Sequence, residues 1–445
     1  MNKEKLIEKI LKTIKDKKIS FIELRFTGIF GQDHNTIIPS HELEKSFETG
    51  TWFDGSSIEG FVRISESDMY LRPDPTTFFI SPFNNNEKIK IGKIICDIYT
   101  PDGEPFLKDP RYILKHQDEI ARKKGWIFKA ASELEFFIFK RENGELSVTP
   151  HDDISYFESN IAGNAPEIRL WIMSHMEDIG IKMEMGHHEV APGQHEIDFV
   201  YDDAVKMADY IQTYKYIVKS VAYLHNYEAT FMPKPEVGIS GSGMHTHFSL
   251  FNEKGENIFY DKEKELSDIA NSFFSGILKY IKEMALITNP TVNSYKRLVP
   301  GYEAPVLICA GKKNRSALIR IPATRNVPKS TRGELRNPDP SANPYLLFAV
   351  MLGAGLKGIE ENLPPPIMYD DNIYELSREE RKKRGIGRLP NDMGHAIKFF
   401  ESSKLMREIL GDELFDFYLE TKIKEYHEYQ FNQISDWEIS RYFNI

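Results

Sequence analysis

The chain has 445 residues, of which 41% are hydrophobic and 12% aromatic, and this length predicts two domains rather than one core. Its formal net charge is −10, and the basic residues are interspersed with acids, which argues against nucleic acid as the main partner. No apolar run approaches the roughly 18 residues of a membrane span, and the charged N-terminus lacks the apolar core of a signal peptide. The only two cysteines, Cys96 and Cys309, suggest no disulfide framework. We therefore expect a cytoplasmic enzyme that has no membrane partner.

The first hundred residues predict a small, sheet-rich domain. Residues 1–18 have the pattern of an amphipathic helix, and residues 19–100 alternate short apolar runs with turn signals. The stretch "TPDGEPFLKDPR" that follows is rich in proline, glycine and aspartate, which favours a boundary. We expect one domain of residues 1–103 and a larger one of residues 104–445.

The larger part mixes helices and strands in an irregular order. Helices are expected at residues 110–125, 202–226 and 266–288 and in the chain after Pro344. Strands are expected at residues 131–139 and 242–251, and two more are joined at Pro192–Gly193. Because this order is not a regular βαβ repeat, the sequence favours the α+β class over a doubly wound sheet.

Acidic and histidine side chains occur in pairs on the expected strands. In "ASELEFFIF" the alternation of strand side chains places Glu133 and Glu135 on one face, about 7 Å apart, where burial and mutual repulsion are costly. Three more groups lie on expected strands: Glu189 with Glu196, His245 with His247, and Glu334. Carboxylates mixed with imidazole and no thiolate suit Mg²⁺ or Mn²⁺ better than structural zinc. A salt-bridged or solvated strand face is the alternative for any single pair.

Arginines crowd the segment around Glu334. The stretches "YKRLVPGYEAP", "NRSALIRIP" and "KSTRGELRNPDP" supply the cations Arg297, Arg315, Arg320, Lys329, Arg332 and Arg336. Four of these arginines interleave with apolar residues as strands would place them, and arginine binds phosphate or carboxylate through a bidentate fork. Ordinary surface arginine is the alternative for each alone, but their density beside a carboxylate favours an anion site next to a metal site, as phosphoryl transfer requires. The small-residue loop "SGSGMH" would let backbone N–H groups approach a ligand.

Seven motifs resemble, in the same order, those of the prokaryotic type I glutamine synthetase family. They are "FDGSSIEGF", "ELEFF", "HHEVAPGQHE", "GSGMHTHFSLF", "KRLVPGYEAPV", "NRSALIRIP" and "RGELRNPDPSANPYL". The resemblance implies an N-terminal β-grasp domain and a catalytic domain with a curved antiparallel sheet, or half-barrel. It also implies a homo-oligomer, a dodecamer of two stacked hexameric rings, with active sites between neighbouring subunits. The implied reaction is the ATP-dependent ligation of ammonia to the side chain of glutamate through γ-glutamyl phosphate.

The resemblance also assigns roles by motif position. The implied ligands of two to three Mg²⁺ or Mn²⁺ ions are Glu135, Glu189 and Glu196 for the first, and Glu133, His245 and Glu334 for the second. The implied nucleotide contacts are Glu184, Tyr201, Ser249, Arg315, Lys329 and Arg332. The implied substrate contacts are Arg297, Arg336, His247, Ser240, Gly241 and, on the phosphate side, Arg320. Asp54 matches the acid that takes a proton from ammonium, Glu303 matches the acid of a flap that closes over the intermediate, and Arg315 is grouped with these as catalytic.

Regulation and departures from the pattern follow from the same resemblance. Arg63 resembles the residue through which some members sense glutamine, which favours feedback inhibition, whereas Tyr374 aligns with a tyrosine that other members adenylylate. Activation by 2-oxoglutarate and control by small nitrogen-signalling proteins are possible by analogy alone. Ser240 replaces a common asparagine, Gly28 replaces a usual aspartate, and "AGKK" at residues 310–313 replaces a stretch that usually carries tryptophan and serine.

Three other functions remain open from the sequence. A γ-glutamyl–amine ligase that uses a larger amine would keep the same nucleotide and metal residues. Retention of Asp54 and Glu303 favours ammonia, because a neutral amine needs less help from an ammonium-binding acid. A catalytically silent homologue would be expected to lose a metal ligand or the flap acid, and a metal-dependent hydrolase does not explain the arginines.

Overall fold

The structure of the chain is a computed structural model. The structure describes residues 2–56, 58–60, 68–83, 89–142, 145–158, 165–302, 304–312, 314, 316–324, 327–370 and 373–443.

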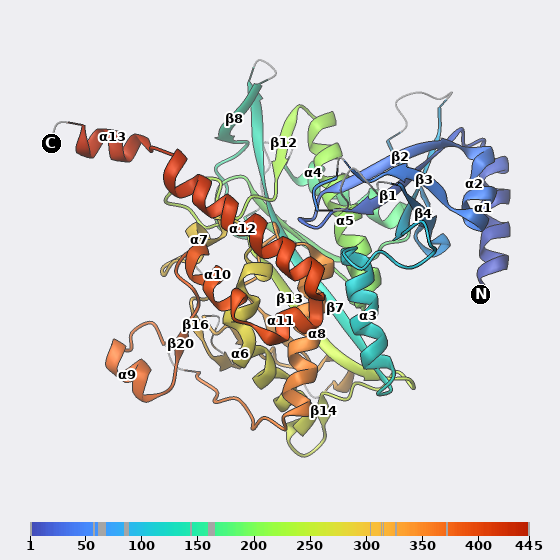
Figure 1. The fold of residues 1–445 in the computed structure, drawn as a ribbon. Coiled ribbons are helices and arrows are strands. Elements are labelled where there is room, and N and C mark those ends of the chain that lie inside the picture. Colours follow the sequence, from blue (N-terminus) through green and yellow to red (C-terminus); the bar gives the residue numbers. More distant parts are fainter. Residues whose placement is uncertain are drawn as a thin grey trace.

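A small mixed sheet forms the N-terminal part (Figure 1, blue). Its strand order is β2-β1-β6-β4-β3, with β5 paired to β6, and only β1 and β6 run parallel. These elements and their helices are α1 (Lys3–Lys17), β1 (Phe21–Thr27), β2 (Asp33–Pro39), α2 (Leu43–Thr49), β3 (Thr51–Asp54), β4 (Asp68–Pro73), β5 (Phe79–Ile80) and β6 (Ile91–Tyr99). Strand β1 is buried along most of its length, which anchors the sheet.

A larger sheet is built around one long strand, β7 (Trp126–Glu142). Its strand order is β17-β18-β19-β13-β7-β10-β9, and β8, β11 and β12 also pair with β7. The partner strands are β8 (Glu145–Pro150), β9 (Met183–His188), β10 (Gln194–Phe199), β11 (Asp202–Asp203), β12 (Tyr227–Thr230), β13 (Met244–Asn252), β17 (Ala310–Gly311), β18 (Ile319–Arg320) and β19 (Gly333–Leu335). All of these pairings are antiparallel except that of β17 with β18.

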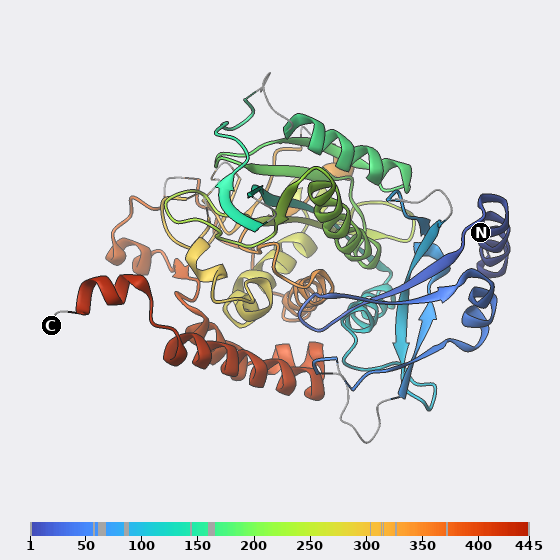
Figure 2. The same cartoon turned by 90° about the horizontal axis from the view of Figure 1, so that it is seen from above.

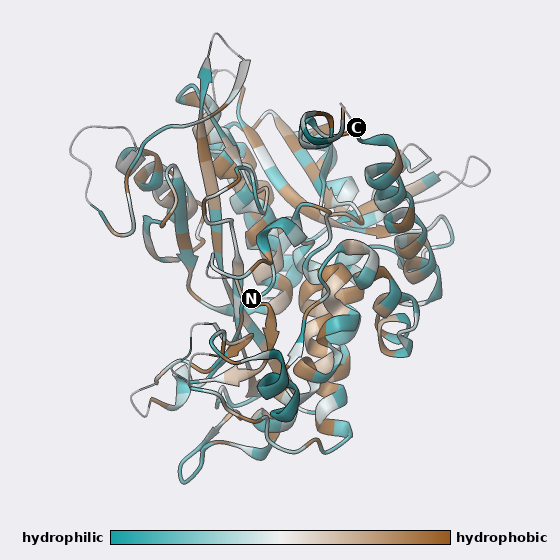
Figure 3. Cartoon of the chain, turned by 90° about the vertical axis from the view of Figure 1, so that its left-hand side faces the viewer, coloured by the Kyte–Doolittle hydropathy of each residue, from teal (hydrophilic) through white to brown (hydrophobic). Residues whose placement is uncertain are grey.

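Helices pack on this sheet and on one another and enclose the main core (Figures 1 and 2). The helices of this part are α3 (Pro110–Arg122), α4 (Ala165–Asp178), α5 (Ala204–Leu224), α6 (Asp268–Thr288), α7 (Ser294–Arg297), α8 (Pro344–Glu360), α9 (Arg378–Lys383), α10 (Met393–Glu401), α11 (Lys404–Leu410), α12 (Asp412–Asn432) and α13 (Asp436–Tyr442). Helices α9 and α13 bury no residue and project from the rest of the domain. Two small pairs, β14 (Tyr260–Asp261) with β15 (Glu265–Leu266) and β16 (Leu307–Ile308) with β20 (Gly387–Arg388), lie outside the main sheet. Helix α8 is buried along almost its whole length, and Figure 3 shows hydrophobic residues concentrated on the helices and strands of the interior.

Polar contacts join the small sheet to the helices of the larger part across the expected domain boundary. The Arg111 guanidinium, which is buried, donates to Asp74 and Asp97 of the N-terminal part and to Asp209 of α5. Asn343, before α8, donates its side-chain N–H to the Gly28 carbonyl. The small sheet is therefore held firmly against the helices behind the large sheet. Within the part of the chain that the structure describes, no helix is both long enough and apolar enough to cross a membrane.

Most elements lie where the sequence predicts them, and the α+β class is confirmed. The expected strand at residues 131–139 is the centre of the much longer β7, because neighbours on both edges extend its pairing. Helices α2 and α4 were not predicted. Arg332 and Arg336 flank the three-residue β19 rather than alternate within a strand, so only Arg320 of the four arginines lies in a described strand.

Candidate active site

The paired strands place the predicted acids and histidines in rows across one face of the sheet. Glu133 of β7 lies opposite His245 of β13 on one side and opposite Asp198 of β10 on the other. Two residues further along β7, Glu135 lies opposite Glu196. The like charges that the sequence places on one strand face are therefore joined by more like charges from the next strand.

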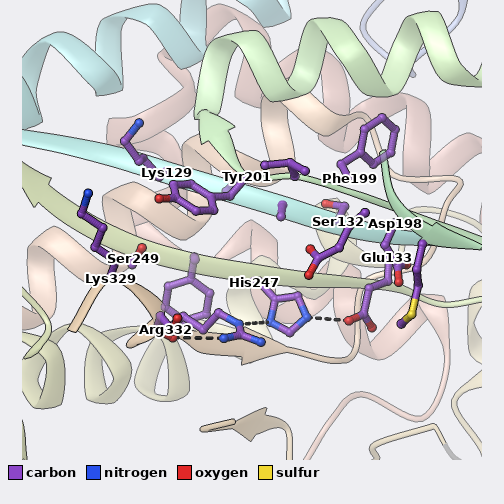
Figure 4. Close-up of a pocket in the computed structure, with 17 residues that line it drawn as sticks. Lys129, Ser132, Glu133, Asp198, Phe199, Tyr201, His247, Ser249, Lys329 and Arg332 are labelled. Carbon is purple, nitrogen blue, oxygen red and sulfur yellow. Dashed lines mark hydrogen bonds and ion pairs between the residues drawn. The ribbon is translucent and has the colours of Figure 1, made fainter. Parts of the chain in front are cut away.

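At one end of this face, protein cations neutralise the carboxylates. His247 accepts a hydrogen bond from Arg332 at Nδ1 (3.1 Å) and donates through Nε2 to Glu133 (2.6 Å), as Figure 4 shows. His245 also lies within hydrogen-bond distance of Glu133 (3.2 Å). Burial by itself raises the pKa of Glu133, but the two histidine hydrogen bonds outweigh it and hold that pKa below its ordinary value.

Glu334 is neutralised in the same way, although its side chain is completely buried. Arg320 donates to one carboxylate oxygen (2.6 Å) and Arg336 donates to the other. Burial raises the pKa of Glu334, while nearby His247 and Arg336 lower it more, so the carboxylate stays charged. One ligand atom each from Glu133, His245 and Glu334 lies within 4.8 Å of the others, which is close enough to hold a single cation.

Glu135, Glu196 and Asp198 lack comparable cationic partners among the described residues, although Asp198 lies directly opposite Glu133. Burial and repulsion from Glu189 raise the pKa of Glu135 to about 8, against the opposing charge of Arg297. Burial raises the pKa of Asp198 to about 8 and that of Glu196 well above its ordinary value, with neighbouring carboxylates adding to both. The hydrogen-bond donors to Glu135 are neutral, namely the Gln194 side chain (2.8 Å) and the Gly243 N–H (2.9 Å).

The hairpin of β9 and β10 brings Glu189 near these carboxylates. Glu189 lies 2.9 Å from Nε2 of His187, which is 3.7 Å from Glu196. Ligand atoms of His187, Glu196 and Asp198 form a second group within 4.8 Å. Oxygen-rich clusters of this kind suit hard divalent cations, which would offset the repulsion that the protein leaves uncompensated.

A cavity of about 470 Å³ lies beside the neutralised end (Figure 4). Five predicted nucleotide contacts line it, together with His247: Glu184, Tyr201, Ser249, Lys329 and Arg332. Lys129 of β7 also lines this cavity and adds a cation. The structure therefore places His247 in this cavity rather than in the one that contains the other predicted glutamate contacts.

A second cavity, of about 450 Å³, lies over the other end of the carboxylate rows. It is lined by the predicted first-metal residues and by the predicted substrate contacts Ser240, Gly241, Arg297, Arg320 and Arg336. Burial lowers the pKa of Arg297. Gly243 separates Arg297 from Glu135 so closely that a Cβ there would lie 2.6 Å from Nη2 of Arg297, which explains the glycine. Glu133 lines both cavities.

Several predicted residues are not brought to these cavities. Asp54 is an exposed residue at the end of β3, where it accepts a hydrogen bond from the Ser56 N–H. Among the described residues that line the two cavities, none comes from the N-terminal sheet. Glu303, Arg315 and Arg63 lie outside the described residues, as does Lys313.

Three residues of the site were not predicted. Asp198 follows Glu196 by two positions in "HEIDF", so the strand alternation that paired Glu133 with Glu135 would have found it. His187 and Lys129 carry no local signal of this kind, because their position at the site depends on strand pairing.

Tyr374 and the departing residues have clear surroundings. The Tyr374 hydroxyl donates to the Ala304 carbonyl (3.0 Å) and accepts from the Val306 N–H (3.3 Å), at the wall of the second cavity. A Cβ on Gly28 would lie 2.7 Å from the His34 ring, so His34 occupies the space that a side chain there would need. Ala310 and Gly311 form the edge strand β17, and Lys312 pairs with Glu265 away from both cavities.

The fold and the site together define a class of protein. Rows of buried carboxylates on an antiparallel sheet lie between two cavities, and both cavities present basic side chains to a ligand. This is the arrangement of a metal-dependent enzyme that brings two anionic substrates together.

Comparison with known proteins identifies the family. Residues 107–442 match the glutamine synthetase catalytic domain, and residues 18–101 match the glutamine synthetase beta-grasp domain. The chain is 46% identical over 440 residues to a glutamine synthetase of Clostridium saccharobutylicum and 47% identical over 441 residues to one of Methanosarcina mazei. Each alignment covers 98% of both proteins. The chain therefore belongs to the glutamine synthetase family, and the N-terminal sheet is the expected β-grasp domain.

Solved structures with the same fold include a more distant group. A structure titled "GmaS/ADP complex-Conformation 1" has a TM-score of 0.88 and 31% identity, and covers 98% of this chain and 99% of its own. An "Apo GmaS without ligand" structure has a TM-score of 0.86 and 30% identity. Identity to the glutamine synthetases is higher over the same length, and the large sheet is the expected half-barrel.

Proposed function

We propose that this protein is a glutamate–ammonia ligase, which uses ATP to make glutamine, ADP and phosphate from glutamate and ammonia. The observation that carries the proposal is the position of Glu133, which lines both the nucleotide cavity and the second cavity. The two cavities therefore adjoin at this carboxylate, where a group could be transferred from one to the other. The full-length similarity to glutamine synthetases supports the same reaction.

The carboxylate rows fit divalent cations of the Mg²⁺ or Mn²⁺ type. Glu135, Glu196 and Asp198 are buried acids whose pKa values are raised, so a bound cation would restore their charged forms. Asp198 has a buried oxygen with no hydrogen-bond partner among the described residues. The proposed first-metal ligands are Glu135, Glu189 and Glu196, and the proposed second-metal ligands are Glu133, His245 and Glu334.

Each cavity would hold one anionic substrate. In the first, Lys329, Arg332 and Lys129 supply positive charge for a nucleotide's phosphates, and the exposed Tyr201 supplies an aromatic face; Glu184 and Ser249 complete the proposed nucleotide contacts. In the second, Arg297 and Arg336 would hold the glutamate carboxylates beside Ser240 and Gly241. Arg320 and Arg315 are proposed to contact the phosphate being transferred.

The residues of the chain would act mainly by position and charge. Arg320 and Arg336 hold Glu334, and His247 holds Glu133, so these two carboxylates are already oriented. Divalent cations, when bound, neutralise charge on the transferring phosphoryl group. Glutamate then attacks the γ-phosphate through its side-chain carboxylate, and ammonia displaces phosphate from the acyl phosphate. Glu303 is proposed to close over this intermediate and exclude water.

We propose that Asp54 serves the site of a neighbouring subunit in a ring. Within one chain, Asp54 is exposed and contributes to neither cavity, whereas every proposed metal ligand lies in the other domain. A carboxylate near ammonium would bind the cation and accept its proton before the attack. The exposed face of β3 is therefore available to reach across a subunit interface.

Mixed rings test the shared site. Asp54→Ala and Glu334→Ala should each abolish synthesis, and rings assembled from both variants should regain activity, because some interfaces pair two intact halves. Co-assembly is first verified by native mass spectrometry, with rings of each single variant as controls. Mixed rings that form and stay inactive would refute the shared site.

The finer expectations remain part of the proposal. Family resemblance supports three of them: a dodecamer of two stacked hexamers, a domain boundary between residues 103 and 104, and glutamine sensing through Arg63. The matched ranges 18–101 and 107–442 also support the boundary. The engaged hydroxyl of Tyr374 favours feedback inhibition over its adenylylation. If Arg63→Ala left inhibition by glutamine unchanged, glutamine sensing through that residue would be wrong.

The deciding experiment measures ATP-dependent product formation with ammonia, methylamine and ethylamine as competing nucleophiles. Glutamine should form with the highest kcat/KM, and synthesis should require Mg²⁺ or Mn²⁺. A preference for either alkylamine would assign the chain to γ-glutamyl–amine ligation. ADP release without any amide product would indicate a different reaction.

A further inference from the structure

A second group of histidines lies on the opposite face of the β9–β10 hairpin from the proposed active site. His195 of β10 alternates with Gln194 and Glu196, so its ring points toward the helices rather than toward the cavities. His151, directly after β8, places its Nε2 atom 2.7 Å from Nε2 of His195. Asp152 follows, and its Oδ2 atom lies 3.2 Å from the same His151 nitrogen.

These three ligand atoms converge on one buried point. The nitrogens of His151 and His195 and a carboxylate oxygen of Asp152 lie within 4.8 Å of one another. The side chains of His151 and Asp152 are only 2% and 7% exposed, and His195 is fully buried. Oδ2 of Asp152 has no hydrogen-bond partner among the described residues, although burial makes an unpaired carboxylate oxygen costly.

Proton positions explain why this oxygen is left unpaired. Arg169 donates to Nδ1 of His195 (2.6 Å), so the neutral ring carries its proton on Nε2 and donates it to His151. Nε2 of His151 is then an acceptor and has no proton to give to Asp152. A cation bound between the three atoms would replace the hydrogen bond between the two histidines and would coordinate both nitrogens and the unpaired oxygen.

His188, the last residue of β9, extends the group. Its Nε2 donates to Oδ1 of Asp152 (3.1 Å), and its Nδ1 lies 2.6 Å from the Glu189 carbonyl. A hydrogen bond of this kind is usual for a carboxylate that ligates a metal, because it fixes the orientation of the ligand. The Gly193 N–H also donates to Oδ1 (2.8 Å), so Asp152 is fixed in place.

We propose that His151, Asp152 and His195, with His188 orienting Asp152, form a binding site for a transition-metal cation of the zinc class. Imidazole-rich sites favour Zn²⁺ and its neighbours over Mg²⁺, which prefers oxygen ligands. A tetrahedral zinc with bonds of about 2.0–2.1 Å holds its ligand atoms about 3.3 Å apart, so the two facing nitrogens must separate by about 0.6 Å. The oxygen and nitrogen of Asp152 and His151 already have nearly this spacing.

The bound cation would fasten the end of β8 to the hairpin that carries Glu189 and Glu196. Metal binding would break the hydrogen bond from Arg169 to His195, because a metal on Nε2 of His195 moves the remaining ring proton to Nδ1. Arg169 must then turn away, which its partly exposed position at the start of α4 allows. Removing this guanidinium should therefore tighten metal binding.

Zinc retention by the full-length oligomer tests the site. The protein is stripped with EDTA, loaded with Zn²⁺ under saturating Mg²⁺, passed through gel filtration, and its zinc measured by plasma mass spectrometry. Wild type should retain one more zinc per chain than Asp152→Asn, which keeps the Gly193 hydrogen bond, and than His151→Gln. The exposed His41→Ala variant is the control and should retain the wild-type amount.

Two further readouts separate a metal site from a structural polar cluster. Tetrahedral Co²⁺ in place of zinc should give visible d–d absorption in wild type and not in His151→Gln. The variant Arg169→Gln, whose amide oxygen can accept from Nδ1, should bind zinc at least about ten-fold more tightly. Equal zinc in wild type, Asp152→Asn and His151→Gln would overturn the site, as would wild type that retains none. Unchanged affinity in Arg169→Gln would exclude His195 as a ligand.

Discussion

The two ends of the carboxylate rows differ in how the protein treats their charge. Glu133 and Glu334 are held by histidines and arginines, and their pKa values lie below the ordinary range. Glu135 and Glu196 lie two positions further along the paired strands, Asp198 lies directly opposite Glu133, and burial raises the pKa of all three. Glu334 is at least as buried as these three acids and still has a lowered pKa, so the placement of protein cations decides which carboxylates stay charged.

This difference indicates how the site is prepared for its ligands. Glu133 and Glu334 are already neutralised and oriented by the fold. Glu135, Glu196 and Asp198 repel one another, and a bound cation would offset this repulsion. The cation should therefore bind as these carboxyl groups release their protons. Four predictions test this contrast, from the largest expected effect to the smallest.

Removing either carboxylate should abolish synthesis. Glu135→Gln and Glu334→Gln each remove a proposed ligand of a different cation, and loss of several kcal/mol of charge stabilisation lowers kcat/KM by about 1,000-fold. Initial rates of glutamine formation at saturating Mg²⁺ give the comparison, with the exposed Glu253→Gln as control. Activity near that of wild type in either variant would contradict the role of that carboxylate.

The same two substitutions should change metal-free stability in opposite directions. Glu334→Gln leaves Arg320 and Arg336 without their shared anion and should lower stability by on the order of 3 kcal/mol. Glu135→Gln removes repulsion while its amide oxygen still accepts from Gln194 and Gly243, and should raise stability near pH 8. Thermal unfolding in EDTA measures both effects. If both variants shifted the unfolding temperature in the same direction, the two carboxylates would not differ in how the protein compensates their charge.

Stability without metal should fall as the pH rises through the neutral range. The folded chain keeps protons on Glu135 and Asp198 up to about pH 8, whereas ordinary Glu and Asp release them near 4.5 and 3.8. Because the folded state binds more protons in this window, the free energy of unfolding decreases with pH there. Mg²⁺ should stabilise more near pH 8 than near pH 6, since fewer protons compete with it.

Glu135→Gln provides the control for this pH dependence. The substitution removes one of the groups that holds a proton, so the slope of unfolding temperature against pH in EDTA should become shallower. An unchanged slope would show that other groups cause the pH dependence.

The smallest effect is expected at the wall of the second cavity. Tyr374→Phe removes the hydroxyl that bonds both Ala304 and Val306, next to the proposed flap acid, at a cost of about 1 kcal/mol. The KM for glutamate should rise a few-fold while the KM for ATP stays unchanged. His247→Gln should do the reverse, because His247 lines the nucleotide cavity. Equal effects on both KM values would mean that the two cavities are not separate sites.

The sequence by itself determined the features that depend on near neighbours in the chain. Strand alternation placed Glu133 beside Glu135 on one face, and the proline–glycine turn predicted the hairpin that carries Glu189 and Glu196. Seven ordered motifs indicated the family, which the matched domains then confirmed. The strand and turn signals can be read from the sequence alone, because side-chain alternation and turn geometry are set within a few residues.

Only the tertiary structure decided which charges meet. Register across three strands puts His245 and Asp198 on either side of Glu133, and this determines which acids receive protein cations. The same pairing turns His195 away from the active site and toward His151, 44 positions earlier in the chain. Such contacts were not predictable from local pattern, because burial and electrostatic fields depend on atoms that are close in space and distant in sequence.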